Sequence, residues 1–248
     1  SDKILCEDTR RSIKLLNFYK IKKKLISYHK FNEKKLLPFA VNSILGGEKI
    51  ALISDAGTPI LSDPGLLLLR ECIKKNIKIF PIPGTSAVTT AVSISGFDDK
   101  YLFYGFLPKK EKQIDTVLRN IKDYNFSIVF FIPAIKINFY IKLFKKYFLN
   151  REILVAKEMT KIHENFYRKK LKYFDGFESK IKGELTVVLS EINKKYTSKE
   201  NKVDSKTLKI EIGKYLKRYS LRDVVKLISE KNKLSKKEVY DLCLKIKN

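Results

Sequence analysis

Histidine and cysteine are scarce in this sequence. Its 248 residues include two histidines, His29 and His163, and three cysteines that lie far apart along the chain. So few ligands argue against a histidine-rich zinc or iron site and against catalysis that needs two imidazole rings. Three widely spaced cysteines also give no disulfide framework. We therefore expect chemistry that runs without a protein-bound metal.

Long apolar runs are missing as well. No stretch of about 18 uncharged apolar residues occurs, so no membrane span is expected. The first ten residues, SDKILCEDTR, are rich in charge and lack the apolar core of a signal peptide. These absences predict a cytoplasmic protein without a membrane partner. The G-x-G-x-x-G, Walker A and G-x-S-x-G motifs are also absent, which disfavours dinucleotide oxidoreductases, P-loop NTPases and serine hydrolases.

Positive charge, in contrast, is abundant. The chain has 52 Lys and Arg against 27 Asp and Glu, a formal net charge of +25 and a pI near 9.8. A charge of this size favours a polyanionic partner, because neutralised phosphates release counterions. Only eight of the basic residues are arginine, however, and a codon bias toward A and T would also enrich lysine. The charge alone leaves both interpretations open.

The most distinctive stretch is KIALISDAGTPILSDPG at 49–65. Its apolar residues 50–53 predict a buried strand, and the turn-forming residues that follow show neither helical nor alternating periodicity. A loop of this length after a buried strand is often functional. The alternative is ordinary turn chemistry in a plain connection.

A second stretch has a matching layout. Residues 77–82, IKIFPI, predict another buried strand, which leads through Pro-Gly and two hydroxyl residues into a helix at 87–95. This order presents free backbone N–H groups to a ligand at the carboxyl edge of an α/β sheet. We expect the two loops to line one crevice.

Strands and helices alternate over most of the chain, which predicts an α/β fold with parallel sheet. A short strand-like run begins at residue 3, further strands are expected at 25–28, 50–53, 77–82, 101–106, 126–132, 151–156 and 184–190, and helices at 12–18, 34–45, 66–75, 87–95, 111–122 and 134–148. Residues 157–168 follow a predicted strand and are dense in ionisable groups. Gly105 and Pro108 mark a junction, so we expect one α/β domain at 1–105 and a second at 106–195.

The end of the chain is different in character. Residues 193–205 are polar and lysine-rich and predict a linker. Helices are expected at 207–217, 221–230 and 235–246, with Ser220 and Ser235 as N-caps and Ser235 with Glu238 as a capping box. The last two resemble a helix-turn-helix, so residues 206–248 are expected to form a small helical module.

Seven motifs span almost the whole chain: LCEDTR at 5–10, LISYHKFNE at 25–33, ALISDAGTPILSDPG at 51–65, PGTSAVTTAVSISG at 83–96, FYGFLPKK at 103–110, KEMTKIHENFYR at 157–168 and GELTVVL at 183–189. Together they resemble the ribosomal RNA small subunit methyltransferase I family, in the tetrapyrrole-methylase-like class of S-adenosylmethionine enzymes. EDTR followed by SDAGTP and SDPG is the most specific part of the resemblance.

The resemblance implies two α/β domains with S-adenosylmethionine in the cleft between them, usually in a homodimer. It also implies methylation of the ribose 2′-hydroxyl of a cytidine in the decoding region of 16S rRNA, so that the partner is 16S rRNA or the small ribosomal subunit. On this reading the donor pocket is lined by Asp55, Ala56, Gly57, Thr58, Pro59, Pro83, Gly84, Thr85, Ser86, Ala87, Phe106, Leu107, Phe131 and Ile132.

The candidate groups near the reacting hydroxyl are Glu7, Asp8 and Arg10, because a neutral hydroxyl is a poor nucleophile and gains from a placed base. Asp55 is a further candidate near the hydroxyl, and Lys161 and Glu164 are secondary candidates. Each has a simpler explanation: Asp8 and Arg10 can just pair, and Asp55 can cap its own loop.

The sequence departs from the family pattern in three places. Family members usually have a strand and a T-P-I-G-N loop upstream of EDTR, so the start of this sequence is expected to be truncated. FIPAIK at 131–136 stands where an acid followed by S-P-H-R is usual, and Lys169-Lys170 replace Gly-Thr. Two alternatives remain: a tetrapyrrole-precursor methylase, and a non-catalytic basic RNA-binding protein if the loop is missing from the protein itself.

Overall fold

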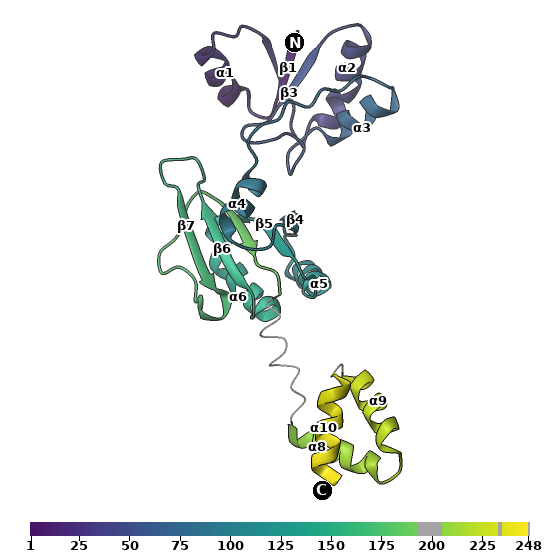
Figure 1. The fold of residues 1–248 in the computed structure, drawn as a ribbon. Coiled ribbons are helices and arrows are strands. Elements are labelled where there is room, and N and C mark those ends of the chain that lie inside the picture. Colours follow the sequence, from purple (N-terminus) through teal and green to yellow (C-terminus); the bar gives the residue numbers. More distant parts are fainter. Residues whose placement is uncertain (193–204, 233–234, 248) are drawn as a thin grey trace. The chain divides into compact units, whose positions relative to one another are not determined.

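The structure, a computed structural model, describes residues 1–192, 205–232 and 235–247. The chain divides into two compact units, Ser1–Glu191 and Ile192–Asn248 (Figure 1). The first unit contains two sheets with helices, and the described part of the second contributes three helices, which confirms the expected α/β fold with a helical module. No helix in the described ranges has both the length and the apolar composition needed to cross a membrane.

The first sheet is parallel, with the strand order β2–β1–β3. Its elements are β1 (Lys3–Cys6), α1 (Thr9–Phe18), β2 (Lys24–Ser27), α2 (Glu33–Leu45), β3 (Ile50–Ile53) and α3 (Leu66–Lys74). Leu5 and Tyr28 are fully buried in its core, where they pack with Val41 and Cys72 from the helices. Because the strands are parallel, the loops that follow β1 and β3 leave the sheet at the same edge.

Residues 77–82 do not form the expected strand. This segment has no regular secondary structure, and Phe80 and Ile82 are 77% and 85% exposed. A strand needs a neighbour that takes its backbone hydrogen bonds, and the described part of the first sheet ends at β3, with which this segment does not pair. The helix that follows, α4 (Ala87–Ser95), forms where it was expected.

The second sheet is mixed rather than parallel, with the order β4–β5–β8–β6–β7. Its strands are β4 (Tyr101–Phe106), β5 (Ser127–Pro133), β6 (Glu152–Lys157), β7 (Asn165–Lys170) and β8 (Glu184–Leu189). Only β4 and β5 are parallel. The polar edge strand β7 was not among the strands predicted from the sequence. Residues 158–164 are too few for a parallel crossover, so β7 returns antiparallel to β6.

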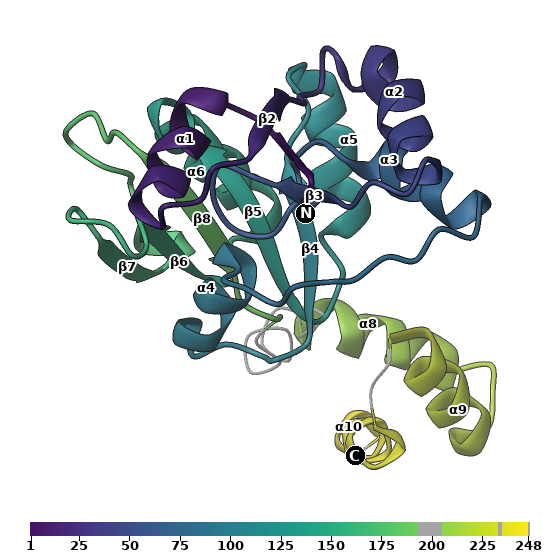
Figure 2. The same ribbon diagram turned by 90° about the horizontal axis from the view of Figure 1, so that it is seen from above.

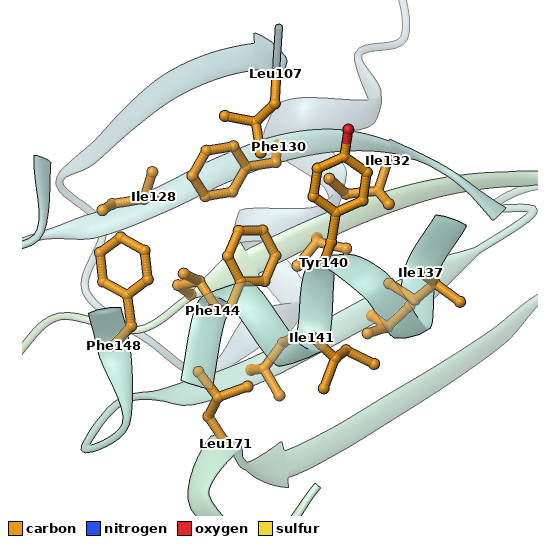
Figure 3. Packing of buried hydrophobic residues seen from close by; sticks show 14 of the residues in the cluster. Leu107, Ile128, Phe130, Ile132, Ile137, Tyr140, Ile141, Phe144, Phe148 and Leu171 are labelled. Atoms are coloured by element: carbon orange, nitrogen blue, oxygen red, sulfur yellow. The ribbon is translucent and has the colours of Figure 1, made fainter. Parts of the chain in front are cut away.

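Helices cover both faces of the second sheet (Figure 2). On one face lie α5 (Glu111–Ile121) and α6 (Ile137–Phe148), which follows a single 3-10 turn, Ala134–Lys136; a second such turn is Leu171–Tyr173. Phe130 of β5 stacks on Phe144 of α6 with ring centroids 5.1 Å apart (Figure 3). On the other face α4 packs against β8 and β6.

The change from one sheet to the other lies between α3 and α4. Since α4 packs on the second sheet and β4 pairs with β5, the expected boundary between residues 105 and 106 falls inside a strand. Gly105 instead marks an irregularity in that strand, because the pairing register shifts between Phe103 and Gly105 and the glycine has φ 79°.

The second unit holds α8 (Ser205–Leu216), α9 (Leu221–Asn232) and α10 (Lys236–Lys247) around one apolar core. The Ser220 hydroxyl accepts the Asp223 N–H at 3.3 Å, and Ser235 and Glu238 exchange the two bonds of a capping box, each at 3.2 Å. Both predicted caps are confirmed. Most of the predicted linker, 193–204, lies outside the described residues.

Candidate functional site

Residues 54–65 after β3 and residues 83–86 before α4 lie against each other. The Thr58 hydroxyl donates a hydrogen bond to the backbone carbonyl of Thr85, 3.3 Å away. A Cβ placed on Gly57 would come within 3.8 Å of the same carbonyl oxygen. The two loops that the sequence predicted to share one crevice therefore meet in the folded chain.

The backbone of the loop 54–65 is unusual. Ile60 and Ser62 have φ of 78° and 74°, a region that a β-branched residue such as isoleucine almost never adopts. Such a backbone persists only where its surroundings fix it. Gly65 supplies part of that fixation: its N–H donates to the Glu33 carboxylate at 3.2 Å, and a Cβ there would lie 2.5 Å from the Leu52 side chain.

The N-terminus of α4 directly follows residues 83–86 and has no side-chain cap. Ser86 occupies the N-cap position, but its side chain makes no cap hydrogen bond. The first-turn N–H groups of α4 therefore remain available to a polar or anionic ligand group. At the other end of the helix, Arg168 of β7 donates to the carbonyls of Ile94 and Ser95. These bonds attach the C-terminal end of α4 to the second sheet.

Asp8 and Arg10 pair with each other, as one interpretation of the sequence anticipated. Asp8 is the N-cap of α1, and its carboxylate accepts the Arg10 N–H at 2.9 Å and the guanidinium at 3.0 and 2.8 Å. These bonds lower the pKa of Asp8 to about 2. The Asp8 N–H in turn donates to Asp55 at 3.2 Å, and Asp55 lies 3.5 Å from the Arg11 guanidinium. Both carboxylates therefore already have partners within the protein.

A groove of about 490 Å³ opens at the carboxyl ends of the three strands of the first sheet. It is lined by Glu7, Asp8, Thr9, Arg10, Ser27, His29, Phe31 and Asp55. The structure thus brings all three candidate catalytic residues together with Asp55. The other residues expected at the donor pocket lie outside this lining.

Asp63, expected from the sequence only as a turn former, carries a perturbed carboxyl group. Burial raises its pKa to about 6, the carboxylates of Glu7, Asp55 and Glu184 add to the rise, and Lys30 opposes it. Glu184 belongs to β8, so Asp63 lies where the two sheets of this unit approach each other. The sequence signal was the second Ser-Asp pair in SDAGTPILSDPG, but only the folded loop places it near Glu7.

The four candidates from the second sheet separate into two pairs. Phe106 is 56% exposed, and its ring centroid lies 5.4 Å from that of Phe131. Leu107 and Ile132 are only 8% and 2% exposed, and their side chains pack in the core under α5 and α6. Phe131 and Ile132 point to opposite faces because side chains alternate along a strand, so their side chains do not line one pocket together.

Lys161 and Glu164, the secondary candidates, lie in the loop that joins β6 and β7, where they make contacts within the loop and with β8. The Lys161 ammonium lies 3.1 Å from both Glu158 and Glu184, and the Glu164 carboxylate accepts the Thr160 N–H at 2.7 Å. These contacts shape the loop.

The residues present fit S-adenosylmethionine, a nucleoside with a positive sulfonium centre. The two meeting loops offer exposed backbone groups, the neighbouring carboxylates offer negative charge, and Phe106 offers an aromatic face. Over residues 1–192, 205–232 and 235–247, no group of three or more His, Cys, Asp or Glu is placed to hold a metal ion.

Known structures share this fold. The methyltransferase CobJ superposes with a TM-score of 0.57 at 15% identity, covering 77% of this chain and 83% of that one. Uroporphyrin-III C-methyl transferase from Thermus thermophilus, solved in complex with S-adenosyl homocysteine, gives a TM-score of 0.54 at 10% identity, covering 77% and 86%. At these identities the likeness concerns the fold alone.

Sequence comparison is more specific. The family described as Tetrapyrrole (Corrin/Porphyrin) Methylases matches residues 1–175. Ribosomal RNA small subunit methyltransferase I of Thermotoga maritima is 42% identical over 76% of this chain and 86% of its own length, and that of Rickettsia prowazekii is 35% identical over 100% and 88%. The chain therefore belongs to the tetrapyrrole methylase family and, within it, to the ribosomal RNA small subunit methyltransferase I family.

Proposed function

We propose that this protein transfers a methyl group from S-adenosylmethionine to the ribose 2′-hydroxyl of a cytidine in the decoding region of 16S rRNA. The observation that carries the proposal is the Thr58–Thr85 contact, which joins two exposed loops beside an acidic groove in a chain of this family. The net charge of +25 supports a polyanionic substrate.

Different residues would bind the methyl donor and align it with the hydroxyl. When bound, the donor supplies a methyl carbon activated by the positive sulfonium. The backbone of residues 55–59 and 83–87 would hold it, with Phe106 and Phe131 beside it, and the Asp8–Asp55 bond keeps α1 in place against the loop. Alignment of the hydroxyl with the methyl carbon is the main demand, since a near-attack geometry contributes about 7–11 kcal/mol.

The proposal includes a homodimer in the cytoplasm that acts on 16S rRNA or the small ribosomal subunit. Light scattering on the purified protein tests the dimer, and a mass of one 28.9 kDa chain would contradict it. Both forms of the RNA substrate, free and assembled, can be offered in the same assay.

The decisive experiment is methyl transfer in vitro. Small subunits from cells that lack the gene are incubated with the protein and radiolabelled S-adenosylmethionine, and primer extension at low nucleotide concentration then maps 2′-O-methyl stops. We expect label in 16S rRNA and one new stop at a decoding-region cytidine. Label in a tetrapyrrole precursor with none in RNA would favour the alternative methylase, and donor binding without any transfer would leave an RNA-binding protein.

A further inference from the structure

Phe31 is an exposed aromatic residue at the groove of the first sheet. It lies in the turn between β2 and α2, is 97% exposed, and lines the groove together with Thr9 and His29. Exposure alone does not distinguish it, because isolated apolar side chains on a surface are common and Ile162 is equally exposed. Its place in the groove does, since a ligand bound there would meet an open aromatic ring.

The backbone around Phe31 is held by hydrogen bonds. The Phe31 N–H donates to Nδ1 of His29 at 3.2 Å, and the two rings lie with their centroids 6.0 Å apart at an interplanar angle of 64°. The Asn32 side chain accepts the His29 N–H at 2.8 Å and donates to the Ser27 carbonyl at 2.9 Å. The ring is therefore presented from a preorganised turn, which lowers the entropy cost of binding a ligand.

The groove and the loops proposed to hold the methyl donor share one residue. Asp55 lines the groove, whereas residues 56–59 and 83–87 lie outside its lining. Methyl transfer needs two reactants side by side. With the donor on those loops, the adjoining groove is left for the second reactant, which on the proposed function is RNA.

Positive charge at the groove suits an RNA strand. The carboxylate of Asp8 already pairs with Arg10. That of Asp55 lies 3.5 Å from Arg11. The side chains of the two arginines are 88% and 68% exposed, and Lys30, in the turn between β2 and α2, is exposed as well. Phosphates can therefore reach these cations while a base reaches the aromatic ring.

We propose that Phe31 stacks on an unpaired base of the substrate RNA and so positions the strand beside the methyl donor. The inference rests on the proposed function. Proteins that bind single-stranded RNA stack its bases on exposed aromatic side chains, and charged groups nearby hold the backbone. Phe31 contacts the base and takes no part in the chemistry at the ribose hydroxyl.

The first test measures binding to small ribosomal subunits from cells that lack the gene. Phe31→Ala should weaken binding by about 5- to 150-fold, the range for loss of one base–aromatic stack, and Phe31→Tyr should keep wild-type affinity. Phe31→Leu should be as weak as Phe31→Ala, because leucine keeps apolar bulk but has no π face. Donor affinity by calorimetry should stay within about twofold in all three variants.

Phe18→Ala is the matched control for this series. Phe18 is 78% exposed, ends α1 and lies outside the groove lining, so its removal should leave the affinity for subunits unchanged. An equal loss in Phe18→Ala and Phe31→Ala would overturn the assignment of a stacking site to the groove.

The second test uses the lack of tryptophan in the chain. Phe31→Trp places a single fluorophore at the groove, and a stacked base should quench its emission when a single-stranded oligoribonucleotide is added. Inorganic polyphosphate carries the charge without the bases and should leave the emission unchanged. Phe18→Trp should respond to neither. Quenching of Phe31→Trp by polyphosphate, or equal quenching of both variants by the oligoribonucleotide, would contradict stacking at Phe31.

The outcomes separate this inference from the proposed function. If the wild-type protein labels 16S rRNA and Phe31→Ala binds subunits with unchanged affinity, only the role of Phe31 is lost. If Phe31→Leu restores the affinity, the contact is apolar, as with a ribosomal protein, and the stacking assignment is wrong. If the wild-type protein neither binds nor labels RNA, the proposed function fails and this inference fails with it.

Discussion

The backbone N–H of Asp8 donates to the carboxylate of Asp55 at 3.2 Å, which ties the start of α1 to the loop after β3. Two motifs that are 47 residues apart, EDTR and SDAGTP, thereby become one structural unit at the edge of the first sheet. Asp8 uses its own carboxylate to cap α1. Its place in the motif is thus explained by structure, whatever it contributes to catalysis.

This arrangement predicts the effect of removing the cap. Asp8→Ala should lower the free energy of unfolding by about 0.5–2 kcal/mol, because the Arg10 N–H loses its acceptor. Asp8→Asn keeps a side-chain oxygen at the N-cap and should recover most of the loss. Urea unfolding monitored by circular dichroism measures both variants, and an equal loss in the two would show that the charge rather than the cap matters.

Gly57 tests the contact between the two loops. Its φ of 72° and its place beside Thr85 predict that Gly57→Val weakens binding of S-adenosylmethionine by about tenfold or more, because a strained, bulkier residue displaces the loop. Gly47→Val is the matched control: its φ is 96°, but no atom lies within 4 Å of its Cβ position. Calorimetry should find donor affinity reduced in the first variant and normal in the second. An equal loss of donor affinity in both variants would show that the effect comes from general destabilisation of the protein.

Burial on both faces made some elements predictable from sequence. The run SIVFFIP of β5 is buried under α4 on one side and α6 on the other, so its continuous apolar character was a reliable signal. The strand predicted from the apolar run at 77–82 was wrong, because a strand forms only where a neighbouring strand takes its backbone hydrogen bonds. The polar edge strand β7 gave no apolar signal at all. The perturbed environment of Asp63 could not be predicted either, since the carboxylates near it come from the segments after β1 and β3 and from β8, which only the fold brings together.

The raised pKa of Asp63 also predicts how stability varies with pH. A carboxyl group whose pKa is higher in the folded than in the unfolded state destabilises the fold when it is ionised, and this cost disappears as the pH falls from about 7 to below 4. The free energy of unfolding of Asp63→Asn at pH 7 should therefore be about 1 kcal/mol higher than that of wild type, a value reduced to allow for the partial exposure of the group. The difference should vanish near pH 4. Urea titrations at pH 7, 5.5 and 4 measure it, and a less stable variant at pH 7 would contradict the assigned environment.

The second unit has its own apolar core, and several of its basic residues are exposed and available to contact rRNA phosphates. Replacing the exposed Lys217, Arg218, Arg222 and Lys226 by glutamine should weaken rRNA binding without unfolding the three helices. If all four contact phosphates, the slope of log K against log salt should become shallower by about 0.7 for each contact to a single strand. Lys231→Gln serves as the control because its ammonium already pairs with Glu211. An unchanged slope in the variant with all four substitutions would show that these helices do not contact rRNA and have a role in packing only.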